Sequence, residues 1–434
     1  MSAAGGAAGT VVRSAGPVTR ASGKILGEPL ARWRDAAREE LGLTAEVICG
    51  TGHQAEWWHP GIVAKFAWAA RRSQELGLGA PAWLIVDTDV RDPLAMRVPV
   101  REDGALQARM LRIGARRAQG TVACARAAAL PDDCGAVAAR CEPPCAADGL
   151  RAAWDAAARH ADAGDAAEQV TLAQRDLLPA LGPCGGMVRT SRMLACSLGR
   201  AIAERAATDP DACARAFNDA VALVPRVARP LAHANAGGTE LPFWTDAGDG
   251  TRRAVTAASL RDALREGAPL WPRAFLTSVL ARTVLCDRFV HGLGGEVYER
   301  ATEAFARAFL GAELPPFDVA TATVRLPFAP EAGPAPLTEA ERRQRWFDPD
   351  AQGPAPSAAK HAHLERLASL ARGSAERRDA WRAMHADLSA ARARRHDEFH
   401  ALAQRASADR ARAAEAALRN DRTWAAVLHK SVPG

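Results

Sequence analysis

The stretch Cys49–Lys65, CGTGHQAEWWHPGIVAK, decides how the rest of the chain is interpreted. An apolar run, Ala45–Cys49, leads into it, and a run with helical spacing, Pro60–Leu76, overlaps its end. The order is strand, glycine-bearing turn and helix. The first amides of such a helix have no partner within the helix, and they favour anions such as phosphates. An ordinary strand-to-helix turn with a buried histidine would have the same pattern, so both interpretations stay open at this point.

This turn supplies the first candidate site residues. His53 carries an imidazole that titrates near neutral pH, and Gln54 carries an amide. His59 and Lys65 could neutralise the charge of a bound phosphate, and glycine lets the backbone approach a ligand closely. We expect a catalytic role for His53 and cofactor binding by Gly50, Thr51, Gly52, Gln54, His59 and Lys65.

A second apolar run, Ala82–Val86, is predicted to be the next strand. A strand, a helix and a strand within about forty residues are typical of a parallel pair. Ligands of such sheets bind at the carboxyl ends of the strands. Asp87 and Asp89 come directly after the second strand, so we expect them beside His53 as catalytic carboxylates. They could hold a substrate amine, a ribose hydroxyl or a magnesium ion.

A second glycine-rich turn lies in the later segment CDRFVHGLGGEVYERATEAF, Cys286–Phe305. Phe289–Val290 enters the turn and a helix is predicted from Glu296. The candidate residues here are His291, as a catalytic group, and Gly292, Gly294, Gly295 and Tyr298, as cofactor-binding groups. A tight turn that needs glycine for positive φ would explain the same letters. The run Phe317–Leu326 is predicted to be a late strand of the same sheet.

The composition predicts a globular cytoplasmic protein. Of 434 residues, 48% are hydrophobic, which suffices for a sizeable core. The net charge of +6 comes without a basic block interleaved with aromatic residues, so nucleic acid is not an expected partner. We find neither the apolar core of a secretory signal nor a run of roughly 18 apolar residues that could span a membrane.

Nine cysteines are expected to be reduced thiols. Cys134, Cys141 and Cys145 fall in a loop-rich segment, where they could hold zinc or remain buried free thiols. Their spacing lacks a CxxC pair and a nearby histidine. No metal-binding residue is therefore assigned, and the two alternatives stay open.

Three of these stretches together resemble the bacillithiol-biosynthesis cysteine-adding enzymes, the BshC family of cysteine ligases. The matching residues are Thr51, Gly52, His53, Gln54 and Lys65, then Asp87 and Asp89, then Phe289, Val290, His291, Gly292, Leu293, Gly294 and Tyr298, with Phe217–Asn218 in a further helix. The resemblance covers Ala45–Leu326 discontinuously and the C-terminal helical part loosely. The chain departs from the family pattern at His53, His291 and Gly295 and is shorter than typical members.

The resemblance implies a Rossmann-like parallel sheet core with a helical insertion and a C-terminal antiparallel coiled coil or helical hairpin. The domain boundaries expected from this are a mobile N-terminus at 1–22, core segments at 23–149 and 231–330, a helical connective region at 150–230, a linker at 331–356 and the arm at 357–434. Helical spacing on both sides of Gly373–Ser374 predicts two long antiparallel helices within Ser357–Ala417.

The implied activity is a ligase that forms an amide between cysteine, or another amino acid, and a small amino-sugar conjugate. Amide ligation needs an activated carboxylate, so ATP or ADP with magnesium is the expected cofactor. We expect one cleft lined by His53, Gln54, Asp87, Asp89, His291 and Gly294.

Two other classes of function stay open at the level of sequence. One is a non-catalytic nucleotide- or metabolite-binding protein whose coiled-coil arm docks a partner. A homodimer through the C-terminal helices is compatible with this class and with the ligase. The other is an RNA-binding protein, which predicts a continuous basic stripe along the arginine-rich arm.

Overall fold

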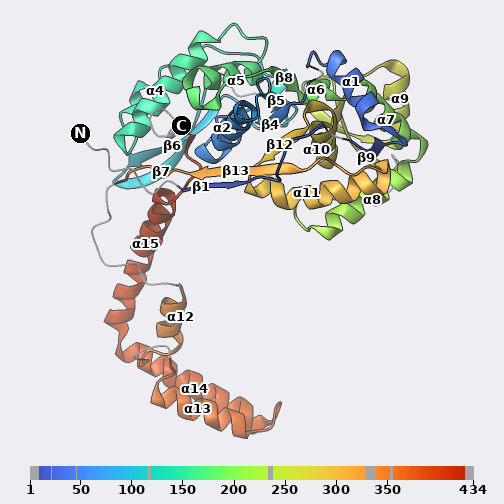
Figure 1. The fold of residues 1–434 in the computed structure, drawn as a ribbon. Helices are drawn as coiled ribbons and strands as arrows, with labels where there is room; N and C mark the ends of the chain where they lie inside the picture. The colour runs from blue at the N-terminus through green and yellow to red at the C-terminus, as the bar shows by residue number, and fades with distance from the viewer. Residues whose placement is uncertain are drawn as a thin grey trace. The chain divides into compact units, whose positions relative to one another are not determined.

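The computed structural model describes residues 9–20, 22–44, 46–114, 119–232, 238–328, 339–351 and 355–425 (Figure 1). The chain divides into two compact units. The first comprises Met1–Phe328 and Asp421–Gly434, and the second comprises Ala329–Asn420. The chain therefore returns to the first unit at its end. Within the described residues, no helix is both long and apolar enough to cross a membrane.

A mostly parallel sheet lies at the centre of the first unit. Over the described residues it has six strands in the order β1-β13-β12-β4-β5-β8. Their bounds are β1 Gly9–Arg13, β4 Cys49–Gln54, β5 Ala82–Val86, β8 Gly186–Arg189, β12 Arg288–His291 and β13 Phe317–Thr323. Among these described strands, all neighbours are parallel except β1 and β13. The structure confirms the predicted mixed α/β fold, with β4 and β5 as parallel neighbours.

Strand β1 comes from the N-terminal segment 1–22, for which the composition predicts mobility. It pairs antiparallel with β13, from Gly9 opposite Thr323 to Arg13 opposite Val319. All side chains of β1 are exposed, so the backbone hydrogen bonds of an open sheet edge hold this strand in place. The hydrophobic pattern of the sequence carries no sign of such a strand.

Strand β4 lies later in the chain than predicted. The sequence predicts a strand at Ala45–Cys49, whereas β4 spans Cys49–Gln54, and Ala45 is outside the described residues. The residues predicted to form the turn are themselves the strand. Glycine occupies a central strand where a neighbouring strand comes close. A Cβ atom on Gly52 would lie 2.5 Å from the Cβ atom of Leu84 in β5.

Helix α2 (Pro60–Glu75) follows β4 and confirms the predicted helix, which differs only in ending at Leu76. His59 is its N-cap, and the Nδ1 atom of this imidazole accepts a hydrogen bond from the amide of Gly61 at 3.1 Å. Pro60 occupies the first helical position, where its missing N–H costs no hydrogen bond. The local sequence thus fixes where α2 begins.

Helix α11 (Leu293–Phe305) follows β12 and begins earlier than the predicted Glu296. Neither Gly294 nor Gly295 has a positive φ, so a turn that needs glycine for that conformation is the wrong explanation of this segment. A Cβ atom on Gly295 would lie 2.6 Å from the Nδ1 atom of His291. Glycine at this position makes room for the imidazole ring.

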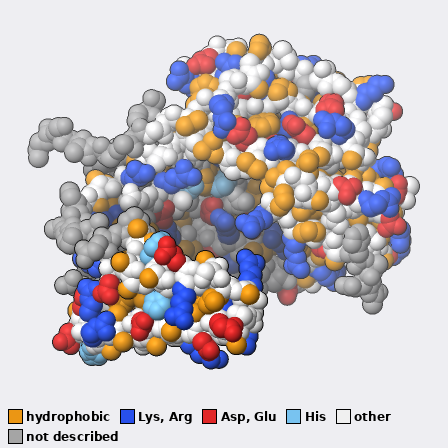
Figure 2. Space-filling view, turned by 90° about the horizontal axis from the view of Figure 1, so that it is seen from below, with side chains coloured by type: hydrophobic (Ala, Val, Ile, Leu, Met, Phe, Trp, Pro, Cys, Tyr) orange, Lys and Arg blue, Asp and Glu red, His pale blue; other side chains and the backbone are white. Residues whose placement is uncertain are grey.

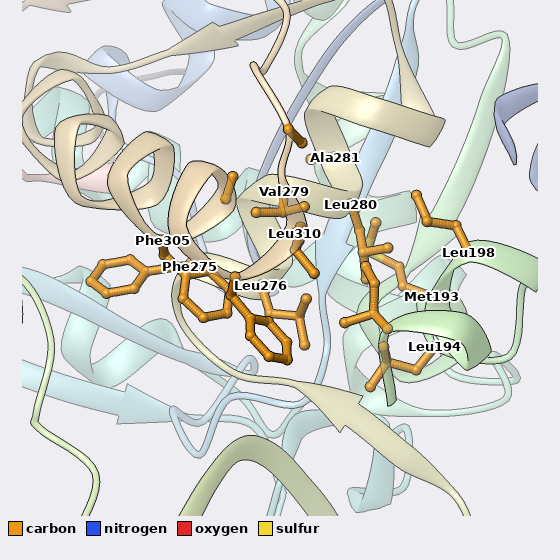
Figure 3. Packing of buried hydrophobic residues seen from close by; sticks show 14 of the residues in the cluster. Met193, Leu194, Leu198, Phe275, Leu276, Val279, Leu280, Ala281, Phe305 and Leu310 are labelled. Atoms are coloured by element: carbon orange, nitrogen blue, oxygen red, sulfur yellow. The ribbon is translucent and has the colours of Figure 1, made fainter. Parts of the chain in front are cut away.

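Buried side chains cover both faces of the central sheet. On one face, Val290 and Ala320 pack against Ala69 of α2. On the other face a larger cluster joins the sheet to α1 (Leu30–Glu40), α7 (Ser197–Thr208), α8 (Pro210–Leu223), α10 (Phe275–Leu280) and α11. Figure 3 shows the part of this cluster where α10 meets α11, with the ring centroids of Phe275 and Phe305 6.3 Å apart. This packing holds α10 and α11 against each other.

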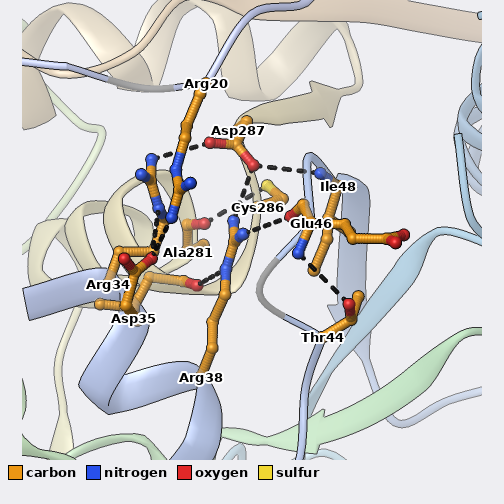
Figure 4. A network of polar contacts seen from close by, with 11 residues as sticks. Arg20, Arg34, Asp35, Arg38, Thr44, Glu46, Ile48, Ala281, Cys286 and Asp287 are labelled. Carbon is orange, nitrogen blue, oxygen red and sulfur yellow. Dashed lines mark hydrogen bonds and ion pairs between the residues drawn. The ribbon is translucent and has the colours of Figure 1, made fainter. Parts of the chain in front are cut away.

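A buried ion-pair network fixes the starts of β4 and β12 to helix α1. The carboxylate of Asp287 accepts hydrogen bonds from Arg34 at 2.8 Å, from Arg38 at 2.9 Å and from the amide of Ile48 at 3.0 Å (Figure 4). Buried charges are costly unless they are paired and hydrogen-bonded, and here one carboxylate serves two guanidinium groups. The network therefore keeps in register the two strands that carry the candidate histidines.

Smaller elements surround the central sheet. Strands β9, β10 and β11 form an antiparallel sheet. Helix α10 is followed directly by a π-helical turn, Ala281–Leu285. The remaining bounds in the first unit are β2 Lys24–Ile25, β3 Glu28–Pro29, β6 Ala95–Glu102, β7 Ala105–Arg112, α3 Gly135–Ala138, α4 Pro144–Arg159, α5 Ala166–Leu177, α6 Thr190–Met193, β9 Glu240–Asp246, β10 Arg252–Thr256, α9 Ala257–Glu266 and β11 Leu270–Pro272.

The second unit is helical. Its described helices are α12 Glu339–Phe347, α13 Ala358–Ser369, α14 Ala375–Arg394 and α15 His396–Arg419. The prediction of two long helices within Ser357–Ala417 is wrong, because the helix breaks again at Arg395. The predicted boundary at Gly373–Ser374 is confirmed: Gly373 has a φ of +83° and Ser374 caps α14. Leu367 of α13 packs against α14 in a small apolar cluster.

Candidate functional site

A pocket of about 510 Å³ lies in the first unit at the carboxyl ends of β4, β12 and β13. The sequence-predicted site residues that line it are Gly52, His53, Gln54, His59, Lys65, His291, Gly292, Gly294, Gly295 and Tyr298. Other lining residues come from the end of β13, from α10 and from the C-terminal segment. The parallel sheet thus brings two distant glycine-bearing segments to one edge, as predicted from their order along the chain.

Two helices begin at this pocket. Gly61 and Ile62 of the first turn of α2 line it, and so do Gly294 and Gly295 of the first turn of α11. The N-cap of α11 is Gly292, which has no side chain to satisfy the first amides of the helix. Unpaired amides and the helix dipole together favour negative charge at such an end. The start of α11 is therefore suited to an anionic group.

Lys65 of α2 places an amine in the pocket, although its residue is 6% exposed. Its Nζ atom donates a hydrogen bond to the carbonyl of Gly52 at 2.7 Å. Burial lowers the pKa of Lys65 to about 7, with the charge of Glu56 acting in the opposite direction. No carboxylate in the described chain forms an ion pair with this amine. Lys65 is therefore a buried cation site whose natural counter-ion would be a ligand.

His53 ends β4 beside a carboxylate that sequence analysis missed. Its Nε2 atom lies 3.2 Å from Oε1 of Glu56, and Glu56 is also held by Arg91 at 2.9 Å. Burial lowers the pKa of His53 to about 4, helped by the charge of Lys65 and opposed by Glu56. The imidazole is therefore neutral at pH 7, and its ring is oriented by Glu56.

His291 ends the neighbouring strand β12 and has a carboxylate partner of its own. Its Nε2 atom lies 3.0 Å from Oε1 of Glu299 in α11, and Glu299 also pairs with the buried Arg282. Burial lowers the pKa of His291, while Glu299 opposes this shift. Two signals in the sequence could have revealed these pairs. One is the spacing of three residues between His53 and Glu56, and the other is an acidic residue in the helix that follows His291.

Four predicted site residues do not line this pocket. Gly50 and Thr51 are inside β4, where the hydroxyl of Thr51 donates to the carbonyl of Val290 at 2.9 Å. Asp87 is buried and binds Arg189 at 2.8 Å and the hydroxyl of Ser191 at 2.6 Å. Side chains alternate along an extended segment, so when Val86 faces the pocket the next residue faces away. Asp87 ties β5 to the segment after β8.

Asp89 lines an adjoining pocket of about 630 Å³ instead of the first one. The two pockets share lining residues, namely Gln54, Val86, Ala274, Thr277 and Tyr298. The predicted single cleft is thus divided: the two histidines and Gln54 meet in the first pocket, and Asp89 stands in the neighbouring one.

The C-terminal segment supplies lining residues that sequence reasoning missed. Arg422 and Thr423 line the first pocket. Trp424 is completely buried and lies under the guanidinium of Arg97, 4.3 Å from the indole centroid, while Arg97 also pairs with Asp421. A single tryptophan directly after the polar run Arg419–Thr423 was the available sign that this segment docks on the first unit.

The pocket fits the phosphates of a nucleotide better than it fits a metal. An amine, two helix starts and Arg422 offer positive charge to an anion. Among the described residues, no group of three or more His, Cys, Asp or Glu side chains is arranged to hold a metal ion. Magnesium is commonly bound through one or two carboxylates together with substrate phosphates, and no carboxylate is among the described residues that line this pocket, so these residues do not by themselves fit a magnesium ion.

The surface in Figure 2 bears on the third class of function. On this face, the described Lys and Arg side chains are interspersed with Asp and Glu, without the continuous basic stripe that RNA binding predicts.

No family model matches the chain, and no curated protein matches it in sequence.

Proposed function

We propose that the pocket binds the phosphates of ATP or ADP and that the protein is a BshC-like ligase with a Rossmann-like core. It would form an amide between cysteine, or another amino acid, and a small amino-sugar conjugate. The observation that carries this proposal is the meeting of Lys65, His53 and His291 with the first turns of α2 and α11 in one pocket. The resemblance of the two glycine-bearing segments to that family supports the reaction class.

Each group has a role in this proposal. The start of α11 and a protonated Lys65 hold the phosphates and stabilise the charge that develops when a carboxylate is activated. A bound anion raises the pKa of a nearby imidazole, so His53 gains basicity when the nucleotide is present. His53, oriented by Glu56, then accepts the proton that the attacking amine loses.

A non-catalytic nucleotide- or metabolite-binding protein is the second candidate. One observation favours it: Asp87, expected to be catalytic, is occupied by Arg189 and Ser191. The pocket then holds fewer titratable groups than an enzyme of this class would use. In this alternative the helices of the second unit form a coiled-coil arm that docks a partner or a second copy of the chain.

Calorimetric titration with ATP and ADP, with and without magnesium, tests the proposal. We expect saturable binding by the wild-type protein, weakened about tenfold or more by Lys65→Met because a charge-assisted contact is lost. Lys24→Met is the matched control, since Lys24 is an exposed residue of β2. Turnover of cysteine with ATP, followed by mass spectrometry of the products, separates the ligase from the binder. Absence of nucleotide binding would reject both.

A further inference from the structure

We propose that the pocket lined by Trp244, Arg252 and Arg273 is a second ligand site, which takes a carboxylate or phosphate group of a second small molecule. It adjoins the first pocket and has a volume of about 630 Å³. Its role as the site of the second substrate rests on the proposed ligase function. Its ability to bind an anion is independent of that function.

Two guanidinium groups are held by one indole in this pocket. The central guanidinium carbon of Arg252 lies 4.7 Å from the ring centroid of Trp244, and that of Arg273 lies 4.5 Å from it. Trp244 is in β9, the middle strand of the antiparallel sheet, with Trp271 of β11 opposite it in register. Stacking on an aromatic ring fixes the plane of a guanidinium and leaves its N–H edges available for a planar anion.

Positive charge exceeds negative charge around this pocket. Arg229, Arg252 and Arg273 line it, against Asp89 and Glu240. Arg273 is paired with Glu240, whereas Arg252 donates to the carbonyl of Thr88 at 2.8 Å and lies 3.9 Å from Asp89. Burial lowers the pKa of Arg252, the charge of Asp89 opposes this shift, and the charge of Arg273 adds to it. Arginine nevertheless stays charged, and the three arginines of this pocket outnumber its two carboxylates, so a bound anion would balance the remaining positive charge.

The position of this pocket suits a ligand that must meet one in the first pocket. Gln54 and Tyr298 line both pockets, and Gln54 follows His53 at the end of β4. Burial raises the pKa of Tyr298 well above its ordinary value, so its hydroxyl remains a neutral hydrogen-bond donor. A ligand anchored by Arg252 and Arg273 would thus extend toward the imidazole of His53.

The chemistry of the pocket favours carboxylate and phosphate over other ligand classes. A guanidinium binds either anion through two parallel N–H···O bonds, which gives orientation as well as affinity. Succinate and inorganic phosphate are simple probes of the two sources of this chemistry. The probe that binds with the higher affinity identifies whether the second ligand carries a carboxylate or a phosphate.

Neighbouring arginines on β10 provide a matched pair for the test. Arg252 lines the pocket, whereas Arg253 is exposed on the other side of the same strand. Calorimetry with succinate and with inorganic phosphate is carried out on full-length Lys65→Met protein, in which the amine of the first pocket is absent. Adding Arg252→Gln is expected to weaken anion binding about tenfold or more, and adding Arg253→Gln to leave it unchanged. Arg252→Lys keeps the charge without the planar fork and serves if the Gln variant fails to fold.

Two results would overturn this inference: equal effects of Arg252→Gln and Arg253→Gln, or no saturable binding of either anion. Nucleotide binding by the wild-type protein is measured separately. If ATP and ADP fail to bind but the anion site depends on Arg252, the proposed ligase function is rejected and the second site stands. If nucleotides bind and the anion site does not depend on Arg252, the second site is rejected and the proposed ligase function stands.

Discussion

At the scale of single residues, burial determines the protonation of the amine and the imidazoles in the first pocket. Lys65 has a carbonyl oxygen as its hydrogen-bond acceptor, and the imidazoles of His53 and His291 are kept neutral by burial. Burial disfavours the charged form of each group, and a second positive charge nearby disfavours it further. A bound anion reverses both effects. Under the proposed function, the pocket would therefore gain positive charge when the nucleotide binds.

The buried amine makes a prediction about stability and pH. The pKa of Lys65 is about 7 in the folded protein and ordinarily 10.5, so between these values the unfolded chain binds a proton that the native protein lacks. The free energy of unfolding therefore rises with pH across this window. We expect Lys65→Met to be more stable than wild type below pH 7 and to lose this advantage as the pH rises toward 10. Urea denaturation at several pH values measures this, and a difference that does not vary with pH would contradict it.

Two adjacent glycines make a second prediction at this scale. A Cβ atom on Gly295 would lie 2.6 Å from Nδ1 of His291, whereas one on Gly294 would meet nothing within 4 Å. Both are in the first turn of α11. We expect Gly295→Ala to displace His291 and to weaken nucleotide binding more than Gly294→Ala does, because Gly294→Ala leaves His291 in place; Gly294→Ala should also stabilise the helix by about 0.5–1 kcal/mol. Calorimetry and thermal melting distinguish the two variants, and equal affinities would show that the imidazole position is unimportant.

At the scale of elements, the ends of neighbouring strands serve different purposes. The last residues of β4 and β12 include histidines that line the pocket, while β5 is followed directly by Asp87, which is bound to Arg189 of β8 and to Ser191 just after it. A carboxylate after a parallel strand can therefore be part of the scaffold. Its hydrogen bonds to a guanidinium, a hydroxyl and a backbone amide hold the edge of the sheet together.

Substitution of Asp87 tests this structural role. Asp87→Asn keeps the shape of the side chain but removes its charge, and the amide cannot accept all three hydrogen bonds. We expect a loss of about 1–3 kcal/mol in the free energy of unfolding. Nucleotide affinity, measured where the variant is folded, should stay close to that of wild type. A large loss of affinity or turnover without a loss of stability would instead return Asp87 to the catalytic group.

At the scale of the whole molecule, the sequence predicts what is local and misses what depends on distant neighbours. The strand Ala82–Val86 and the helix at Pro60 are confirmed because their apolar spacing and caps lie within them. The predicted position of β4 is wrong because its glycines make room for a neighbouring strand, and the local sequence does not show that strand. The carboxylates beside the two histidines were missed because the sequence does not show which acidic residue the fold places next to each imidazole.

The return of the chain to the first unit leads to the last prediction. Trp424 is completely buried, stacks against Arg97 and follows two residues that line the first pocket, Arg422 and Thr423. Truncation of a buried tryptophan leaves a large cavity, so we expect Trp424→Ala to lower the free energy of unfolding by about 3–5 kcal/mol. It should also weaken nucleotide binding, because the segment that carries Arg422 loses its anchor.

A pair of further variants separates these two effects. Arg422→Gln removes one pocket cation from an exposed residue and should weaken nucleotide binding with little change in stability. Trp381→Ala in the second unit is the matched tryptophan control, since Trp381 is 53% exposed and its loss leaves the first unit intact. Denaturation and calorimetry are measured on all three. If Trp424→Ala lowers stability but binds nucleotide as the wild type does, the C-terminal segment is an anchor of the fold and not a wall of the site.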